Sequence, residues 1–238
     1  MRLRVVATGL PHEGADRMLP FVTAGLLALG TSLLVTPLVV RLALRWGVVA
    51  RPGIRKVHRN PVPTAGGIGL FVAFWAAVLL TSSSFKEWTG LLLGSSLLVA
   101  VGFWDDCRGL RPWQKFLGQL AAAVILVAFG TRIDFVTNPL GGMIYVGWWG
   151  IPLTILWIVA LTNSLNFIDG LDGLAAGIAA IACIPLLVIA QQRDATAVVL
   201  LTACLLGASL GFLPFNFNPA RVFMGDTGAM FLGYMLAA

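Results

Sequence analysis

Five aspartates stand at the ends of apolar segments in this 238-residue chain. They are Asp105, Asp106, Asp169, Asp172 and Asp226. Carboxylates at the edge of long apolar segments are costly and mark functional sites by default. Arginines and lysines, among them Lys115, accompany them in the sequence. This combination predicts a site for a metal ion and a phosphorylated substrate.

Asp105 and Asp106 form an adjacent pair at the end of one apolar segment. Neighbouring side chains on a helix end point in different directions. One carboxylate can therefore face a metal ion while the other positions a substrate group or accepts a proton. Lys115, a compact point charge, is suited to a phosphate. An Asp-Asp pair alone equally suits the N-cap of the helix that follows.

Two amides and two carboxylates follow one another at intervals of three residues, at Asn163, Asn166, Asp169 and Asp172. On a helix they would share one stripe, which is costly in apolar surroundings without a ligand or partner. Glycines beside the two acids allow the helix to break into a loop there. Hydrogen bonding between helices would explain Asn163, but it explains four polar residues poorly.

Asp226 lies between two glycines, directly before the last apolar run. It could cap that helix or bind a cation, and the glycines leave room for a bulky ligand. Further upstream, Lys56 and His58 belong to a basic segment that could hold anionic headgroups or a substrate phosphate. A plain positively charged loop explains any single basic residue there, and a lone histidine is more often structural.

Long uncharged stretches separate these residues and must position them. Seven stretches meet or nearly meet the length of about 20 residues that a membrane-spanning helix needs, and an eighth follows Asp226. Charged residues make up 11% of the chain, against about 25% in soluble domains. This composition excludes a soluble enzyme, a disordered chain and a nucleic-acid-binding domain. We expect an all-α, polytopic membrane bundle of about eight spans, forming one catalytic domain over residues 1–238.

The basic residues predict an orientation. Loops after the odd-numbered spans hold ten Lys and Arg residues, loops after the even-numbered spans hold three, and three precede the first span. Cytoplasmic loops carry the excess of Lys and Arg, so the N-terminus is expected outside. The five aspartates then share the cytoplasmic face. Charged residues are thus concentrated at one end of the bundle.

Four motifs, in order, resemble the polyprenyl-phosphate N-acetylhexosamine-1-phosphate transferases, glycosyl transferase family 4. They are Lys-x-His with Pro-x-Pro-x-x-Gly-Gly, Gly-x-x-Asp-Asp with a downstream Lys, Asn-x-x-Asn-x-x-Asp-Gly-x-Asp-Gly, and Pro-Ala-x-x-Phe-Met-Gly-Asp-Thr-Gly. The resemblance runs from about Arg41 to the last residue. Residues 163–177 and 215–233 are most similar to the undecaprenyl-phosphate GlcNAc-1-phosphate transferases. The phospho-N-acetylmuramoyl-pentapeptide transferases rank second.

The resemblance implies transfer of a sugar-1-phosphate, expected to be GlcNAc-1-phosphate, from a UDP-sugar to undecaprenyl phosphate, with release of UMP. This would be a first membrane step of cell-wall or surface-glycan synthesis, at the cytoplasmic face of a bacterial inner membrane. Mg²⁺ is the expected cofactor, with Mn²⁺ as the alternative. Membrane lipids are expected partners, nucleic acid is not, and a homodimer stays open.

The resemblance also implies roles for individual residues. Asn166 and Asp226 would bind Mg²⁺, and Asp105 and Asp106 would be the catalytic carboxylates. A phosphate monoester has a second pKa near ~6, so the lipid nucleophile is largely ionised and a strong base is not essential. The expected substrate-binding residues are Lys56, His58, Lys115, Asn163, Asp169 and Asp172.

The chain departs from the family pattern at its C-terminus. Family members usually continue into further spans and a His-rich loop, whereas this sequence stops twelve residues after Asp226. We therefore expect the chain to lack those parts and to show weak or no activity if it ends there. A cation-coupled transporter is the alternative of another class, but it would place its acids near the bilayer midplane. The CDP-alcohol phosphotransferases space their aspartates differently.

Overall fold

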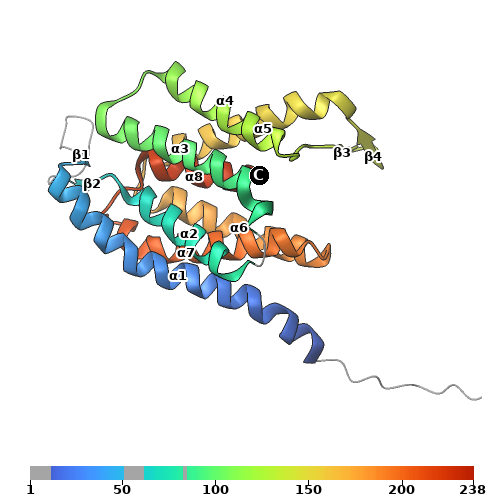
Figure 1. The fold of residues 1–238 in the computed structure, drawn as a ribbon, viewed down its shortest axis with the longest axis horizontal. Helices are drawn as coiled ribbons and strands as arrows, with labels where there is room; N and C mark the ends of the chain where they lie inside the picture. The colour runs from blue at the N-terminus through green and yellow to red at the C-terminus, as the bar shows by residue number, and fades with distance from the viewer. Residues whose placement is uncertain (1–11, 51–61, 83–84) are drawn as a thin grey trace, which may run out of the picture.

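The computed structural model describes residues 12–50, 62–82 and 85–238, with side chains from residue 18 onward. Eight α-helices form the described part: α1 (His12–Trp46), α2 (Gly66–Thr81), α3 (Thr89–Arg108), α4 (Pro112–Ala128), α5 (Gly150–Ile168), α6 (Leu174–Gln192), α7 (Thr196–Asn216) and α8 (Gly225–Ala237). Figure 1 shows them side by side in one bundle. The predicted helical membrane architecture is confirmed.

Five helical segments are long and apolar enough to cross a membrane: Met18–Trp46, Lys86–Arg108, Gly147–Ile168, Leu174–Gln192 and Thr196–Asn216. The helices α2 and α4 are also apolar, with 16 and 17 residues. Large apolar side chains cover the outside of the bundle; Leu34 is 74% exposed and Leu80 is 73% exposed. So much outward apolar surface is characteristic of a face that contacts lipid.

Helix α8 is the buried centre of the half of the bundle that carries the aspartates. Every residue from Thr227 to Met235 is buried, and α8 packs against α2, α3, α5 and α6. Glycines allow this close approach. A Cβ on Gly102 would lie 2.6 Å from the Thr227 backbone, and one on Gly67 would meet Gly228. The first turn of α8 is therefore held tightly between α2 and α3.

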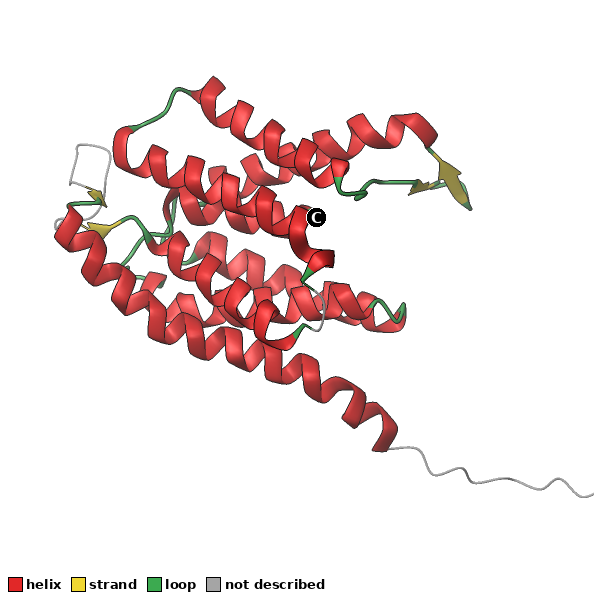
Figure 2. Cartoon of the chain, in the orientation of Figure 1, coloured by secondary structure: helices red, strands yellow, loops and turns green. Residues whose placement is uncertain are grey.

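Short antiparallel ribbons lie at the two ends of the bundle (Figure 2). At one end, β1 (Val49–Ala50) pairs with β2 (Val62–Pro63), close to where α3 turns into α4. At the other end, β3 (Phe135–Thr137) pairs with β4 (Met143–Tyr145) between α4 and α5. The 3₁₀ turns η1 (Lys86–Trp88) and η2 (Gly147–Trp149) precede α3 and α5.

The ends of two helices bear on the site. The fourth apolar helix begins at Pro112, because proline is well tolerated in the first turn, where the N–H has no partner within the helix. The helix that carries Asn163 and Asn166 ends at Ile168. Asp169 and Asp172 lie beyond it in a turn, so the expected break into a loop beside the two glycines is confirmed.

Candidate active site

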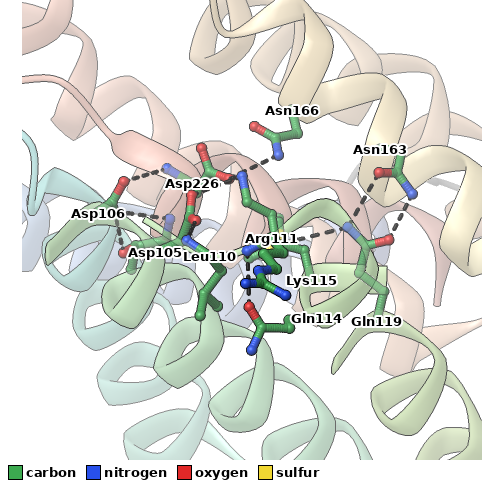
Figure 3. A network of polar contacts seen from close by, with 12 residues as sticks. Asp105, Asp106, Leu110, Arg111, Gln114, Lys115, Gln119, Asn163, Asn166 and Asp226 are labelled. Atoms are coloured by element: carbon green, nitrogen blue, oxygen red, sulfur yellow. Dashed lines mark hydrogen bonds and ion pairs between the residues drawn. The ribbon is translucent and has the colours of Figure 1, made fainter. Parts of the chain in front are cut away.

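Lys115 lies at the centre of a polar cluster built by four helices (Figure 3). Its Nζ is 2.7 Å from Oδ2 of Asp105, on α3, and forms a second ion pair with Oδ2 of Asp226, on α8. Nδ2 of Asn166, on α5, donates to that same Asp226 oxygen at 3.1 Å. Helices α3, α4, α5 and α8 thus bring together one cation, two carboxylates and an amide that are up to 121 residues apart in sequence.

Asp105 also shapes the turn between α3 and α4. Its Oδ1 accepts a hydrogen bond from the backbone N–H of Leu110. Gly109, which ends α3, has a φ of 71°, in the left-handed region that glycine adopts easily. This reversal returns the chain so that Lys115, in the first turns of α4, faces the carboxylate that precedes the turn.

Asp106 points in a different direction from Asp105, as the sequence predicts. Its Oδ1 accepts the backbone N–H of Asp226 at 3.0 Å, and its Oδ2 accepts the backbone N–H and the hydroxyl of Thr227 at 3.2 and 2.6 Å. The first N–H groups of a helix have no partner within it, and its N-terminus favours negative charge. Asp106 therefore caps α8 from outside.

Two helix-capping alternatives are consequently wrong. The Asp105–Asp106 pair does not cap α4, whose N-cap residue is Arg111. Asp226 does not cap α8 either, because Met224 holds the N-cap position and the Asp226 N–H is itself bound by Asp106. The Asp226 side chain is left to face Lys115 and Asn166.

Asn163 pairs with Gln119 beside this cluster. Asn163 Nδ2 donates to Gln119 Oε1 at 2.6 Å, and Gln119 Nε2 donates back to Asn163 Oδ1 at 3.3 Å. Gln119 is 1% exposed. Hydrogen bonding between helices, the alternative left open for Asn163, is what the geometry shows. The sequence reasoning missed Gln119, although an amide one turn after Lys115, at the start of a long apolar run, was a visible signal.

Asp169 follows α5 and faces the same end of the bundle. Within the described residues its carboxylate has no hydrogen bond or ion pair. Burial, and then the negative charges of Asp226, Asp106 and Asp172, raise the pKa of Asp169 to about 8. This crowded carboxylate lies in a place that a cation or a hydrogen-bond donor on a ligand would stabilise.

Asp172 is directed away from Lys115, toward the segment that follows α7. Its Oδ2 accepts the backbone N–H of Ala220 at 3.0 Å and the side-chain amide of Asn218 at 3.3 Å. Asp172 thus joins the α5–α6 turn to the α7–α8 connection. It lies outside the Lys115 cluster but borders the same end of the bundle.

Asn216, to which the sequence reasoning gave no role, strengthens this join. It is 2% exposed, accepts the N–H of Gly173 at 3.2 Å and donates to the carbonyl of Val222 at 2.9 Å. Two polar anchors therefore fix the α5–α6 turn against the chain that leads into α8. That chain carries Asp226, so its placement depends on this join.

The described part of the Pro-x-Pro-x-x-Gly-Gly motif, residues 62–67, leads into the start of α2 and contacts the same segment before α8. The N–H of Phe223 donates to the carbonyl of Pro63 at 2.8 Å, and Gly66 and Gly67 donate to the carbonyls of Phe223 and Met224 at 3.0 and 2.9 Å. The motif is thereby placed beside Asp226. Lys56 and His58, expected to bind substrate, lie outside the described residues.

Residues 88–238 match the model of glycosyl transferase family 4. The chain belongs to this family. It is 40% identical, over 93% of its length, to the "Probable undecaprenyl-phosphate N-acetylglucosaminyl 1-phosphate transferase" of Bacillus subtilis. It is 39% identical, over 83% of its length, to the decaprenyl-phosphate N-acetylglucosaminephosphotransferase of Mycolicibacterium smegmatis, and 37% identical, over 74%, to the phospho-N-acetylmuramoyl-pentapeptide-transferase of Limosilactobacillus fermentum. The chain spans 63%, 53% and 58% of these relatives, respectively.

In this member of glycosyl transferase family 4, the side chains around Asp226 carry ligand atoms of the kinds that bind a magnesium ion. In the described ranges no three His, Cys, Asp or Glu side chains form a metal cage. Mg²⁺ does not need one, since it typically binds one or two carboxylates together with phosphate oxygens and water. Asp226 has carboxylate oxygens and Asn166 has an amide oxygen, and these ligand types fit the ion. In this structure Asn166 turns its Nδ2 toward Oδ2 of Asp226, the oxygen that Lys115 also contacts.

Proposed function

We propose that this chain carries the site that transfers GlcNAc-1-phosphate from UDP-GlcNAc to undecaprenyl phosphate and releases UMP. The observation that carries the proposal is the position of Lys115, held between Asp105 and Asp226 at the end of a membrane bundle. The similarity to the relative from Bacillus subtilis, over 93% of the chain, supports the choice of substrates.

Phosphoryl transfer depends mainly on positioning and on neutralising charge. An oxygen of the lipid phosphate forms a bond to the sugar-linked phosphorus of the UDP-sugar, and the bond from that phosphorus to the bridging oxygen breaks, so that UMP leaves. The lipid phosphate is largely dianionic at neutral pH, because its second pKa is near ~6. Asp105 then has to orient Lys115 and the lipid phosphate rather than remove a proton.

Lys115 provides the positive charge for the reacting phosphates. Its two carboxylate partners hold the ammonium group in place before substrate arrives. An ammonium group has three donors, so a phosphate oxygen can bind the third while both carboxylate contacts remain. Asp106 fixes the start of α8 and so the direction of Asp226. We assign Asp106 this positioning role within the proposed catalytic pair.

Magnesium is part of the proposal, with Asn166 and Asp226 as its ligands. When bound, the ion would neutralise charge on the diphosphate of the UDP-sugar. Asp169 and Asp172 border the space where that substrate would lie, and we propose that they contact it. We also propose that the protein lies in the bacterial cytoplasmic membrane with this site on the cytoplasmic side. The excess of Lys and Arg in the loops after the odd-numbered spans supports this orientation.

The test is UMP release by a full-length form of the protein in proteoliposomes containing undecaprenyl phosphate. Release that requires both UDP-GlcNAc and Mg²⁺, and that is lost in Lys115→Met, supports the proposal. The second candidate substrate is UDP-MurNAc-pentapeptide, favoured by 37% identity to the enzyme from Limosilactobacillus fermentum. Release with this substrate alone would replace the first proposal by the second. Absence of release with both, with equal ligand binding by wild type and Lys115→Met, would contradict both.

A further inference from the structure

Residues 134–149, called here the aromatic hairpin, connect α4 to α5 at the end of the bundle opposite Lys115 (Figure 1). Lys115 is near the start of α4 and Asn166 near the end of α5, so the hairpin joins the far ends of both helices. The 17 residues of α4 span about 26 Å at 1.5 Å per residue. This approaches the roughly 30 Å of a bilayer core.

Both faces of the β3–β4 ribbon are apolar and exposed. Side chains alternate between faces along a strand, so the cross-strand pair Phe135–Tyr145 and the pair Val136–Ile144 lie on opposite faces. Their exposed fractions are 58% and 63% on the first face and 39% and 52% on the second. The ribbon therefore presents exposed apolar side chains on both of its faces.

Hydrogen bonds close the tip of the hairpin and join its base to α5. At its tip, Asn138 donates its N–H to Gly142 O and accepts the N–H of Gly141, each at 3.0 Å. Directly before the hairpin, the N–H of Ile133 donates to the Thr154 hydroxyl of α5 at 2.8 Å. In this arrangement the ribbon extends from α5 with its side chains exposed.

Aromatic residues continue from the ribbon into the start of α5. Trp148 is 88% exposed and Trp149 is 77% exposed, and the outward face of α5 follows with Leu156 at 64%. Tryptophan and tyrosine are enriched where a membrane meets water, because their rings are apolar and their N–H and O–H groups are polar. The aromatic hairpin is thus continuous with the lipid-facing surface of α5.

Residues 132–149, the hairpin with the two residues before it, carry no net charge to attract an ionic partner. Between Lys115 and Asp169 the only charged residues are Arg132 and Asp134, and they form an ion pair of 2.8 Å. We propose that the aromatic hairpin lies within the headgroup region of the leaflet opposite the site, where both of its faces contact lipid. A neutral ribbon of this kind fits zwitterionic lipid as well as anionic lipid.

Spin labels at adjacent positions test this proposal, because Met143 and Ile144 face opposite sides of β4. Met143→Cys and Ile144→Cys are made in the full chain with Cys107→Ser, since Cys107 is the exposed cysteine of the described part. Each labelled protein is reconstituted in phosphatidylcholine vesicles, and the accessibility of the label to oxygen and to a water-soluble nickel chelate is measured. Leu156→Cys marks the lipid-facing reference, and Gln192→Cys, the exposed last residue of α6, marks the aqueous one.

Both labels on β4 should give the same depth, between the two references, and replacing part of the lipid by phosphatidylglycerol should leave it unchanged. Three results would overturn the proposal. Strong nickel access at both positions would place the hairpin in water. Loss of access on one face with spin–spin broadening would show contact with a second copy. A depth that changes with anionic lipid would show electrostatic attachment.

Discussion

The carboxylate of Asp106 accepts both the backbone N–H and the hydroxyl of Thr227, at 3.2 and 2.6 Å. These contacts cross from the end of α3 to the first turn of α8 and orient Asp226, which precedes Thr227. The two adjacent aspartates thus have separate roles. Asp105 binds the Lys115 ammonium group, and Asp106 binds the start of α8, which places Asp226 beside that ammonium group.

Thr227→Val removes one donor to Asp106 while keeping the shape of the side chain. Thr227 is fully buried, so its loss leaves a carboxylate oxygen with one donor fewer. We expect the free energy of unfolding to fall by about 1–2 kcal/mol, measured by reversible denaturation in detergent. Thr227→Ser keeps the hydroxyl and is the matched control. Equal destabilisation by both variants would mean that packing, not this hydrogen bond, is what matters.

Gln119→Leu leaves Asn163 without its partner on α4. In membrane proteins such hydrogen bonds are worth roughly 0.6 kcal/mol on average, so we expect a loss of about 1 kcal/mol in unfolding free energy, with Asn163→Leu similar. The double variant should cost less than the sum, because no amide is then left unpaired. Strict additivity in this double-mutant cycle would show that the two amides do not interact in the folded chain.

The raised pKa of Asp169 makes stability depend on pH in the metal-free chain. Its pKa is about 8 in the folded chain, against an ordinary value of 3.8. The folded chain therefore binds this proton more tightly than the unfolded chain, and stability falls as pH rises from about 4 to about 8. Asp169→Asn removes the effect, so its gain in Tm should be larger at pH 8.5 than at pH 5. The same gain at both pH values would contradict the shift.

Asp226→Asn tests the proposed ion site without removing the side chain. The amide keeps one oxygen ligand but loses the negative charge that favours a divalent cation. Half-maximal UMP release should then need at least tenfold more Mg²⁺ than in wild type. Asp172→Asn, whose carboxylate binds the α7–α8 connection instead, should leave the Mg²⁺ requirement close to that of wild type. Identical Mg²⁺ curves for wild type and Asp226→Asn would exclude Asp226 as a ligand.

Much of the fold follows from the length of the uncharged stretches, since each must form a helix to satisfy its backbone in lipid. The sequence predicted which residue types form the site and that they lie at one end of the bundle. The function of Asp106 was not, because the helix that it caps begins at Gly225, more than one hundred residues later. The glycines beside Asp169 and Asp172 predicted the break in the polar stripe, and α5 does end before Asp169. The β3–β4 ribbon has strands of three residues, too short to predict from alternation.

The most direct test of the proposed chemistry is UMP release from UDP-GlcNAc by Lys115→Met in vesicles that contain undecaprenyl phosphate and Mg²⁺. Methionine keeps much of the length of the lysine side chain but removes the charge that pairs with Asp105 and Asp226. We predict a loss of at least a hundredfold in rate, with the helical content and Tm of the folded protein measured alongside. Release by Lys115→Met within twofold of the wild-type rate would contradict the assignment of Lys115 to the reacting phosphates.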